Sequence, residues 1–249
     1  MQHLIYKHLL ISLILVSTYV QAQEWHFSSG QQQAVLIELY TSEGCSSCPP
    51  AEDYLNGFRR NPELWRRYIP IAFHVDYWDY IGWRDPYADP AHANRQSWYA
   101  RQRNLRSVYT PAFVVNGKAW RRDWSGGKPP GSYSMPGELK VTVNGEQLKS
   151  EFASVTPVSG TLTLNIAVLG MDLMSQIMAG ENQGRTARHE FVVLGYKSIN
   201  STDAQWMTNL PSLSYTGARR YALAAWVSRE DDPTPLQAVG GDMPGFYRK

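Results

Sequence analysis

Residues 34–50, AVLIELYTSEGCSSCPP, join an apolar segment to a Cys-x-x-Cys motif and a proline pair. The segment from Ala34 to Thr41 is β-prone, which predicts a buried strand that ends in the turn at residues 42–44. Pro49 and Pro50 lack backbone N–H groups, so a helix tolerates them only in its first turn. We therefore expect the strand to lead into a helix that begins near Cys48.

Cys45 and Cys48 are the only cysteines among the 249 residues. At the N-terminus of a helix, unpaired N–H groups and the positive end of the dipole lower the pKa of a thiol. The thiolate is the form that attacks disulfides, so the motif predicts a redox site. A structural disulfide and a metal site are the alternatives. The chain-entropy model gives about 1.9 kcal/mol for a four-residue loop, against roughly 3 for fifteen residues, which disfavours a structural disulfide.

The rest of the first half continues this alternation of strands and helices. The expected strands are 34–41, 69–75, 109–115 and 118–121, and the expected helices begin near Cys48 and cover 62–68 and 90–105. Asn116-Gly117 is a strong signal for a type I′ hairpin turn between the last two strands. The expected order is β-α-β-α-β-β, with a helical, Trp-rich insertion between the second and third strands.

The second half has a different pattern. Seven of the thirteen residues from Ser125 to Gly137 are Gly or Pro, which indicates a linker at 125–137 and leaves no closing helix after the hairpin. Beyond it, six short alternating runs predict an antiparallel β-sandwich domain at 138–249. The first domain then covers residues 23–124.

Residues 1–22 predict a secretory signal peptide. They carry Lys7, an apolar run at 9–16 and small residues near Ala22. The apolar core is about a dozen residues long, whereas a membrane-spanning helix needs roughly 20, so a retained anchor is the weaker alternative. We expect an exported protein without a membrane span after cleavage, periplasmic if the source is Gram-negative and otherwise secreted. The formal net charge of +2 favours neither nucleic acid nor anionic lipid as a partner.

The cysteine motif and YTPAFVVNG at residues 109–117 together resemble the thioredoxin-like superfamily. That resemblance implies an α/β thioredoxin-like domain, with Pro111 as a cis-proline facing the cysteines. Thr110 would then present backbone groups to an extended substrate. More closely, GCSSCPPAE, FHVDYWDYIGWRDP, YTPAFVVNG and GENQGRTARHEFVV resemble the exported domain of unknown function 1223 family, and these motifs span both halves of the chain.

By this resemblance, Cys45 is the attacking cysteine and Cys48 the resolving one. The expected function is an exported thiol-disulfide oxidoreductase that acts on protein or small-molecule disulfides through a mixed disulfide. It would need an unknown redox partner and no cofactor besides the Cys45–Cys48 disulfide. The alternatives are a non-catalytic binding module with a structural disulfide and a Cu(I)-handling protein.

Two further residues are candidates near the cysteines. Glu38 lies in the first strand, where a buried carboxylate with a raised pKa would accept a proton from the second cysteine. Its alternative is a carboxylate that points to solvent at the strand edge. His74 closes the second strand and would complete a soft-metal site with Cys45 and Cys48, although a structural histidine is the more common role.

Overall fold

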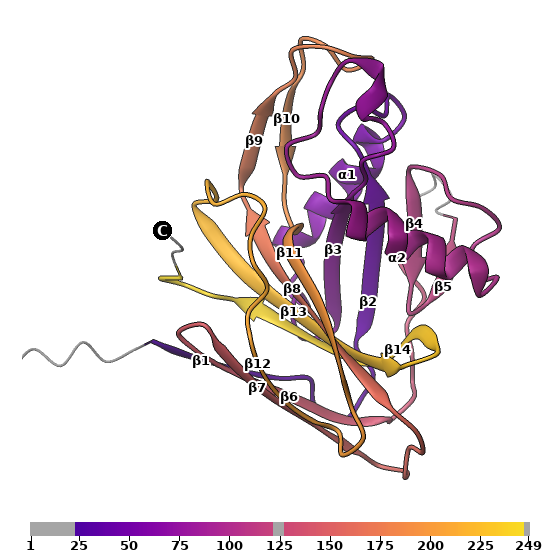
Figure 1. The fold of residues 1–249 in the computed structure, drawn as a ribbon, viewed down its shortest axis with the longest axis vertical. Coiled ribbons are helices and arrows are strands. Elements are labelled where there is room, and N and C mark those ends of the chain that lie inside the picture. The colour runs from indigo at the N-terminus through magenta and orange to yellow at the C-terminus, as the bar shows by residue number, and fades with distance from the viewer. Residues whose placement is uncertain (1–22, 122–126, 247–249) are drawn as a thin grey trace, which may run out of the picture.

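The computed structural model describes residues 23–121 and 127–246, and the expected signal peptide lies outside these residues. Within them the chain forms fourteen β-strands and two α-helices, α1 (Pro49–Asn56) and α2 (Pro90–Arg101). The strands belong to sheets of eight, four and two strands (Figure 1). The fold is therefore mostly β. The expected thioredoxin-like α/β fold followed by a separate β-sandwich is wrong.

The eight-stranded sheet contains strands from both halves of the chain. Its order is β14-β13-β8-β11-β3-β2-β4-β5. The strands are β2 (Val35–Thr41), β3 (Tyr68–His74), β4 (Ala112–Val115), β5 (Lys118–Trp120), β8 (Leu162–Met171), β11 (Val192–Ser201), β13 (Arg220–Arg229) and β14 (Asp232–Asp242).

The two halves join between β3 and β11. Val192 of β11 pairs in parallel with Ala72 of β3, and the Ala72 N–H donates to the Phe191 carbonyl at 2.8 Å. Every residue of β3 is buried, so this strand is unsuited to be an open edge facing water. The second half covers it, which makes one continuous sheet where the sequence predicted two domains. The predicted linker at 125–137 lies partly outside the described residues, and that boundary stays a prediction.

The local strand-helix-strand prediction is confirmed. β2 and β3 are parallel, with a register that runs from Val35 opposite Tyr68 to Thr41 opposite His74. Helix α1 begins at Pro49, as the proline pair predicts, and Cys48 is its N-cap residue. The Asn116-Gly117 turn also forms, because both residues adopt positive φ angles of 44° and 79° and so suit the twist of a hairpin.

The helix expected at 62–68 is absent. Residues 61–67 form turns, in which the Asn61 side-chain oxygen accepts from the Glu63 N–H at 2.9 Å. Trp65 has a φ of +64°, which a right-handed helix excludes. The segment therefore turns at Trp65, whose N–H donates to the Tyr68 carbonyl at 3.0 Å instead of to a preceding carbonyl as in a helix.

Four strands lie outside the sequence prediction. They are β1 (Glu24–Ser28), β9 (Leu173–Gln176), β10 (Thr186–His189) and β12 (Gln205–Asn209). β1 and β12 flank the predicted pair β6 (Gly137–Asn144) and β7 (Gln147–Ser154) in the four-stranded sheet. β9 and β10 form a hairpin at the same end of the molecule as α1, and β10 contacts that helix (Figure 1).

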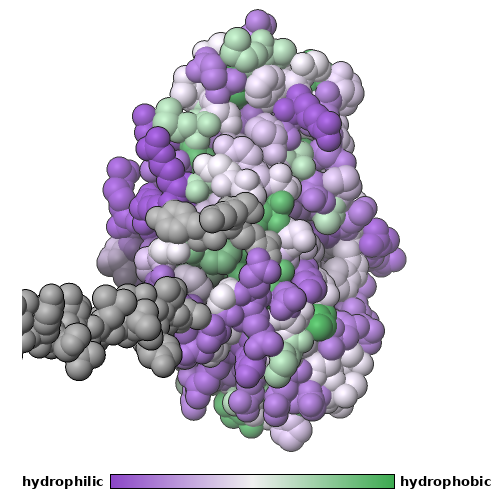
Figure 2. Space-filling model, turned by 60° about the vertical axis from the view of Figure 1, so that its left-hand side comes forward, coloured by the Kyte–Doolittle hydropathy of each residue, from purple (hydrophilic) through white to green (hydrophobic). Residues whose placement is uncertain are grey.

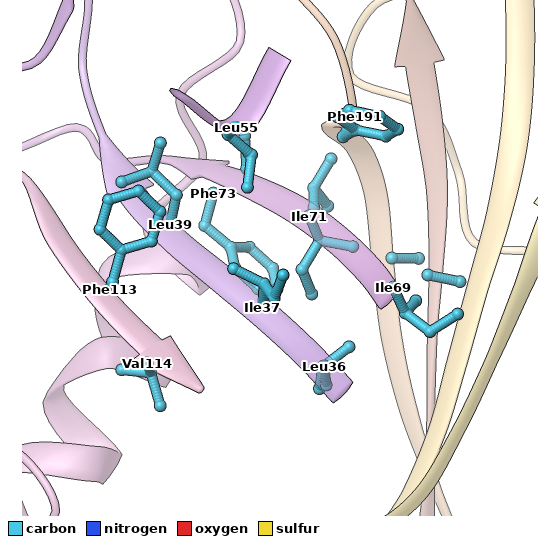
Figure 3. Close-up of a cluster of buried hydrophobic side chains, with 14 of the residues drawn as sticks. Leu36, Ile37, Leu39, Leu55, Ile69, Ile71, Phe73, Phe113, Val114 and Phe191 are labelled. Carbon is cyan, nitrogen blue, oxygen red and sulfur yellow. The ribbon is translucent and has the colours of Figure 1, made fainter. Parts of the chain in front are cut away.

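The core nearest the cysteines is built from both halves. Leu55 points from α1 toward the strands that carry Leu39 and Ile71, and Phe191 from the second half joins the same cluster (Figure 3). No helix occurs between residues 127 and 136, as the composition predicts, and β14 contacts β2 and β3. The second half thus supplies packing that a closing helix would otherwise give.

The surface view shows mainly hydrophilic residues on one face, with hydrophobic residues in small groups (Figure 2). Across residues 23–121 and 127–246, no helix is long and apolar enough to cross a membrane.

Candidate functional site

Cys45 and Cys48 form a disulfide, with their Cα atoms 5.4 Å apart. Cys48 closes the first turn of α1, since its carbonyl accepts from the N–H groups of Ala51 at 2.9 Å and Glu52 at 3.1 Å. Both cysteines are 0% exposed, whereas the Ser46-Ser47 pair between them is exposed. The disulfide is thus placed at the helix N-terminus as expected, but it is covered.

Two segments cover the cysteine loop. Asn182, in the turn between β9 and β10, donates its side-chain N–H groups to the carbonyls of Glu43 at 2.8 Å and Cys45 at 3.0 Å. On another side, a Cβ added at Gly44 would lie 3.1 Å from the Cβ of Trp78, so glycine allows this segment to approach closely. Since both cysteines are fully buried, a partner can reach the disulfide only if part of the surrounding structure moves.

Thr110 and Pro111 directly precede β4. The peptide bond between them is cis, which confirms that part of the prediction. Trp78 donates its indole N–H to the Thr110 hydroxyl at 2.7 Å, and it lies so near Gly44 that a Cβ added there would be 3.1 Å from the Trp78 Cβ. Trp78 therefore connects Thr110 with the cysteine loop. That Thr110 and Pro111 bind an extended substrate stays a prediction.

Glu38 is fully buried in β2 and does not point to solvent. Arg95 of α2 binds its carboxylate through two hydrogen bonds, from Nε at 2.8 Å and from Nη2 at 3.0 Å. The hydroxyls of Tyr99 and Tyr40 donate to the same carboxylate at 2.6 and 2.8 Å. Burial and the neighbouring Glu38 charge raise the pKa of Tyr40 well above its usual value. A role for Glu38 in proton transfer at Cys48 stays a prediction.

Beside the cysteine loop lies a group of buried ionisable residues, which we call the His-carboxylate cluster. Its members come from five segments of both halves and are each at most 8% exposed. They are Glu43 in the turn after β2, Glu52 on α1, His74 at the end of β3, Asp85 in the insertion and His189 at the end of β10.

His74 is held by Asp85. Its Nδ1 lies 2.7 Å from Asp85 Oδ2, and Asp85 also accepts from the N–H groups of Glu43 and Tyr87 at 2.8 and 2.9 Å. His74 Nε2 is buried and has no hydrogen-bond partner among the described residues. Burial lowers the pKa of His74, but the Asp85 carboxylate outweighs it and raises the pKa above its ordinary value.

His189 lies between Glu43 and Glu52. Its Nε2 is 3.0 Å from Glu43 Oε1, and its Nδ1 is 2.9 Å from Glu52 Oε2. The second contact is close enough for an ion pair but misaligned for a hydrogen bond. Burial opposes the charged imidazolium, yet the two carboxylates raise the pKa of His189 to about 10. The Thr41 hydroxyl donates to the Glu52 carboxylate, and the Trp83 indole N–H donates to the Glu43 carboxylate. These two hydrogen bonds orient the carboxylates toward His189.

The two histidines are adjacent, since their ring centroids lie 5.1 Å apart with the planes at 83°. Ligand atoms of Glu52, His74 and His189 all lie within 4.8 Å of one another. The sequence predicts His74 beside the cysteines, and no local pattern brings it together with Glu52, Asp85 and His189. One signal could have pointed to the other members of the cluster. Glu52, Asp85 and His189 each lie in one of the family motifs quoted above.

The fold and site define a mostly β protein with a buried Cys-x-x-Cys disulfide beside a His-carboxylate cluster. Residues 36–228 match the family described as "Protein of unknown function (DUF1223)", and the chain belongs to this family. No match is found among the curated proteins.

Two solved structures have a similar fold. The protein AGR_C_4864 from Agrobacterium tumefaciens aligns with a TM-score of 0.59 at 20% identity, over 88% of this chain and 98% of the other. HBP35 of Porphyromonas gingivalis aligns with a TM-score of 0.58 at 14% identity, over 88% of this chain and 78% of the other. At these identities the likeness concerns the fold alone.

Proposed function

We propose that the protein is an exported thiol-disulfide oxidoreductase that uses Cys45 and Cys48. The observation that carries the proposal is the placement of the only two cysteines in one disulfide at the N-terminus of α1. A bond that closes so short a loop adds about 1.9 kcal/mol to stability in the chain-entropy model. The helix N-terminus favours the thiolate that disulfide exchange needs.

The reaction in the reducing direction has two steps. The Cys45 thiolate attacks one sulfur of a substrate disulfide, forms a mixed disulfide and releases the other substrate sulfur as a thiolate. The Cys48 thiolate then attacks Cys45 Sγ, closes the protein disulfide and releases the second substrate thiolate. Two electrons pass to the substrate, so an external dithiol must reduce the protein again.

Export agrees with this chemistry. The first 22 residues carry the signal-peptide pattern described above, and exported proteins meet an oxidising environment in which disulfides persist. The substrate would be a protein or small-molecule disulfide. Thr110 and Pro111 are the candidate residues for holding it beside Cys45.

The test is reduction of insulin by dithiothreitol with the wild type and with Cys45→Ser and Cys48→Ser variants. We expect catalysis by the wild type only, and a mixed disulfide that accumulates on Cys45 in Cys48→Ser. A Ser46→Ala variant, which changes an exposed residue of the loop other than Ser47, whose hydroxyl contacts Cys45 Sγ, serves as the control and should retain activity. Equal rates with and without Cys45 would refute the proposal.

A second candidate, a non-catalytic binding module with a structural disulfide, is favoured by one observation. Both cysteines are 0% exposed, as a structural disulfide would be. The reduction potential separates the two functions, because structural disulfides have potentials below about −300 mV and resist glutathione. A higher potential would support the oxidoreductase. The Cu(I) alternative with Cys45, Cys48 and His74 has no such observation in its favour.

A further inference from the structure

Three side chains of the His-carboxylate cluster have the composition of a metal site. Glu52, His74 and His189 bring one carboxylate and two imidazoles together, with ligand atoms within 4.8 Å of one another. Two histidines and one carboxylate are a common ligand set for zinc and for non-haem iron. We propose that these three residues bind a divalent transition-metal cation, with Zn²⁺ as the best match. This inference does not rest on the proposed function.

Unpaired nitrogen atoms point to a missing ligand. His74 Nε2 and His189 Nδ1 are buried, and neither has a hydrogen-bond partner among the described residues. Buried polar atoms are nearly always paired, so the orphaned His74 Nε2 needs an explanation, and the His189 Nδ1 beside it has only the ion-pair contact with Glu52 at 2.9 Å. A cation between them and Glu52 would displace the Nδ1 proton of His189 to solvent and then accept a lone pair from each nitrogen.

The opposite nitrogen of each ring is fixed by a carboxylate. Asp85 holds His74 Nδ1 at 2.7 Å, and Glu43 holds His189 Nε2 at 3.0 Å. Metal-binding histidines usually donate their other N–H to a carboxylate or carbonyl, which sets the tautomer and raises the basicity of the ligand nitrogen. Both histidines of the cluster have this arrangement, with one ring nitrogen on a carboxylate and the other facing the proposed metal site. A single buried histidine with a structural role would need only one such hydrogen bond.

Charge gives a further reason. Glu43, Glu52 and Asp85 place three carboxylates around two imidazoles in a region that is almost completely closed to solvent. Buried charges are costly unless they are paired or bind a metal. Metal binding would release the second proton of His189, and a dication would then take over its role by neutralising two of the three carboxylate charges.

The spacing of the ligands suits a small cation. His189 Nδ1 and Glu52 Oε2 lie 2.9 Å apart. Bonds of about 2.1 Å separate neighbouring ligand atoms by roughly 3.0 to 3.4 Å. The widest separation, at most 4.8 Å, closes to that range with a shift of about 1.4 Å, within the reach of side-chain rotation.

The donor types select among metals. Imidazole nitrogen suits zinc, iron and copper(II), whereas Mg²⁺ and Ca²⁺ prefer oxygen ligands throughout. Cys45 and Cys48 are joined in a disulfide and offer no thiolate, which disfavours Cu(I). A cavity of about 160 Å³ is lined by Glu52, Asn182 and His189, so it borders two of the three proposed ligands and has room for a water as fourth ligand.

The experiment is a titration of untagged, oxidised wild-type protein with Zn²⁺ against a chromophoric chelator. We expect one equivalent to bind with micromolar or tighter affinity. His74→Gln and His189→Gln should each weaken binding at least about tenfold, as the loss of even an outer-shell partner does. His26→Gln is the matched control, because His26 is an exposed histidine that pairs with Glu24 and Thr142 and lies outside the His-carboxylate cluster.

Co²⁺ identifies the ligands in the wild type without relying on the folding of any variant. We expect visible bands of nitrogen and oxygen coordination with no thiolate charge-transfer band, and long-range ¹H–¹⁵N spectra in which Zn²⁺ shifts His74 and His189 but not His26. Three outcomes would each overturn the proposal. They are no binding tighter than millimolar, unchanged affinity in both folded histidine variants, and binding that requires reduced cysteines.

Discussion

Arg95 of α2 and Glu38 of β2 form a bidentate ion pair in the core, with N···O distances of 2.8 and 3.0 Å. Both side chains are at most 2% exposed. The guanidinium also lies over the ring of Trp226, 4.8 Å from its centroid. Arg95 therefore connects β2, which carries Glu38, with β13 from the second half of the chain. This pair stabilises the joint between the two halves of the chain.

Removing one partner of this pair should strongly destabilise the fold. Arg95→Met leaves the Glu38 carboxylate buried without its cation, and breaking a buried ion pair in this way costs about 3–5 kcal/mol. Urea denaturation of the variant and the wild type measures the loss. The double variant Glu38→Leu/Arg95→Met removes both charges and should recover part of it. A single variant that loses less than about 1 kcal/mol would contradict this role for the pair.

Asn182 should control how fast reductants reach the disulfide. Asn182→Ala removes two hydrogen bonds to the cysteine loop, each worth about 1 kcal/mol, so opening becomes easier. We expect the rate of reduction by dithiothreitol to rise by up to roughly thirtyfold, since about 1.4 kcal/mol corresponds to a factor of ten and the two bonds together give about 2 kcal/mol. Gln183→Ala changes the exposed neighbour and is the control. An unchanged rate in Asn182→Ala would mean that another segment limits access.

The elements that the sequence predicts well are those fixed by local patterns. The strand at residues 35–41, the helix start at Pro49 and the Asn116-Gly117 turn follow from apolar runs, proline chemistry and positive φ angles. The joining of β3 to β11 depends on a pairing between Ala72 and Val192, far apart in the chain, and no local pattern predicts it. This pairing joins strands from both halves of the chain in the eight-stranded sheet.

The candidate site also has one part that local sequence patterns predict and another that depends on tertiary contacts. Cys45 and Cys48 are recognisable because their spacing and the prolines after them lie in one short segment. His189 reaches Glu52 only because the β9–β10 hairpin, built from short strands with weak patterns, folds against α1. Predicting the His-carboxylate cluster therefore needs the tertiary contacts.

His92 should make stability fall in mild acid. Burial holds its pKa in the folded protein at about 4, although Asp89 and Asp85 face it and its Nδ1–H donates to the His74 carbonyl at 2.7 Å. The unfolded state takes up a proton below about pH 6.5, whereas the folded state does so only near pH 4, so stability decreases as pH falls through this window. Below pH 4 this histidine contributes no further loss.

The measurement is the free energy of unfolding in urea at pH 7 and pH 4.5. We expect His92 to account for roughly 2.5 kcal/mol of the decrease in the wild type. His92→Gln keeps a donor for the His74 carbonyl but has no titrating group, so its stability should fall less over the same range. A parallel fall in both proteins would assign the acid sensitivity to other groups.

The first half of the chain should not fold alone. In a fragment of residues 23–136, β3 would lose β11 as its neighbour and Arg95 would lose the Trp226 ring. The exposed strand edge and the apolar residues behind it would favour association with other chains. We expect this fragment to aggregate or to lack the near-UV circular dichroism of the full chain, which unfolds cooperatively under the same conditions. A monomeric fragment with its own cooperative unfolding transition would instead support a domain boundary at residues 125–137 and contradict the dependence of β3 on β11.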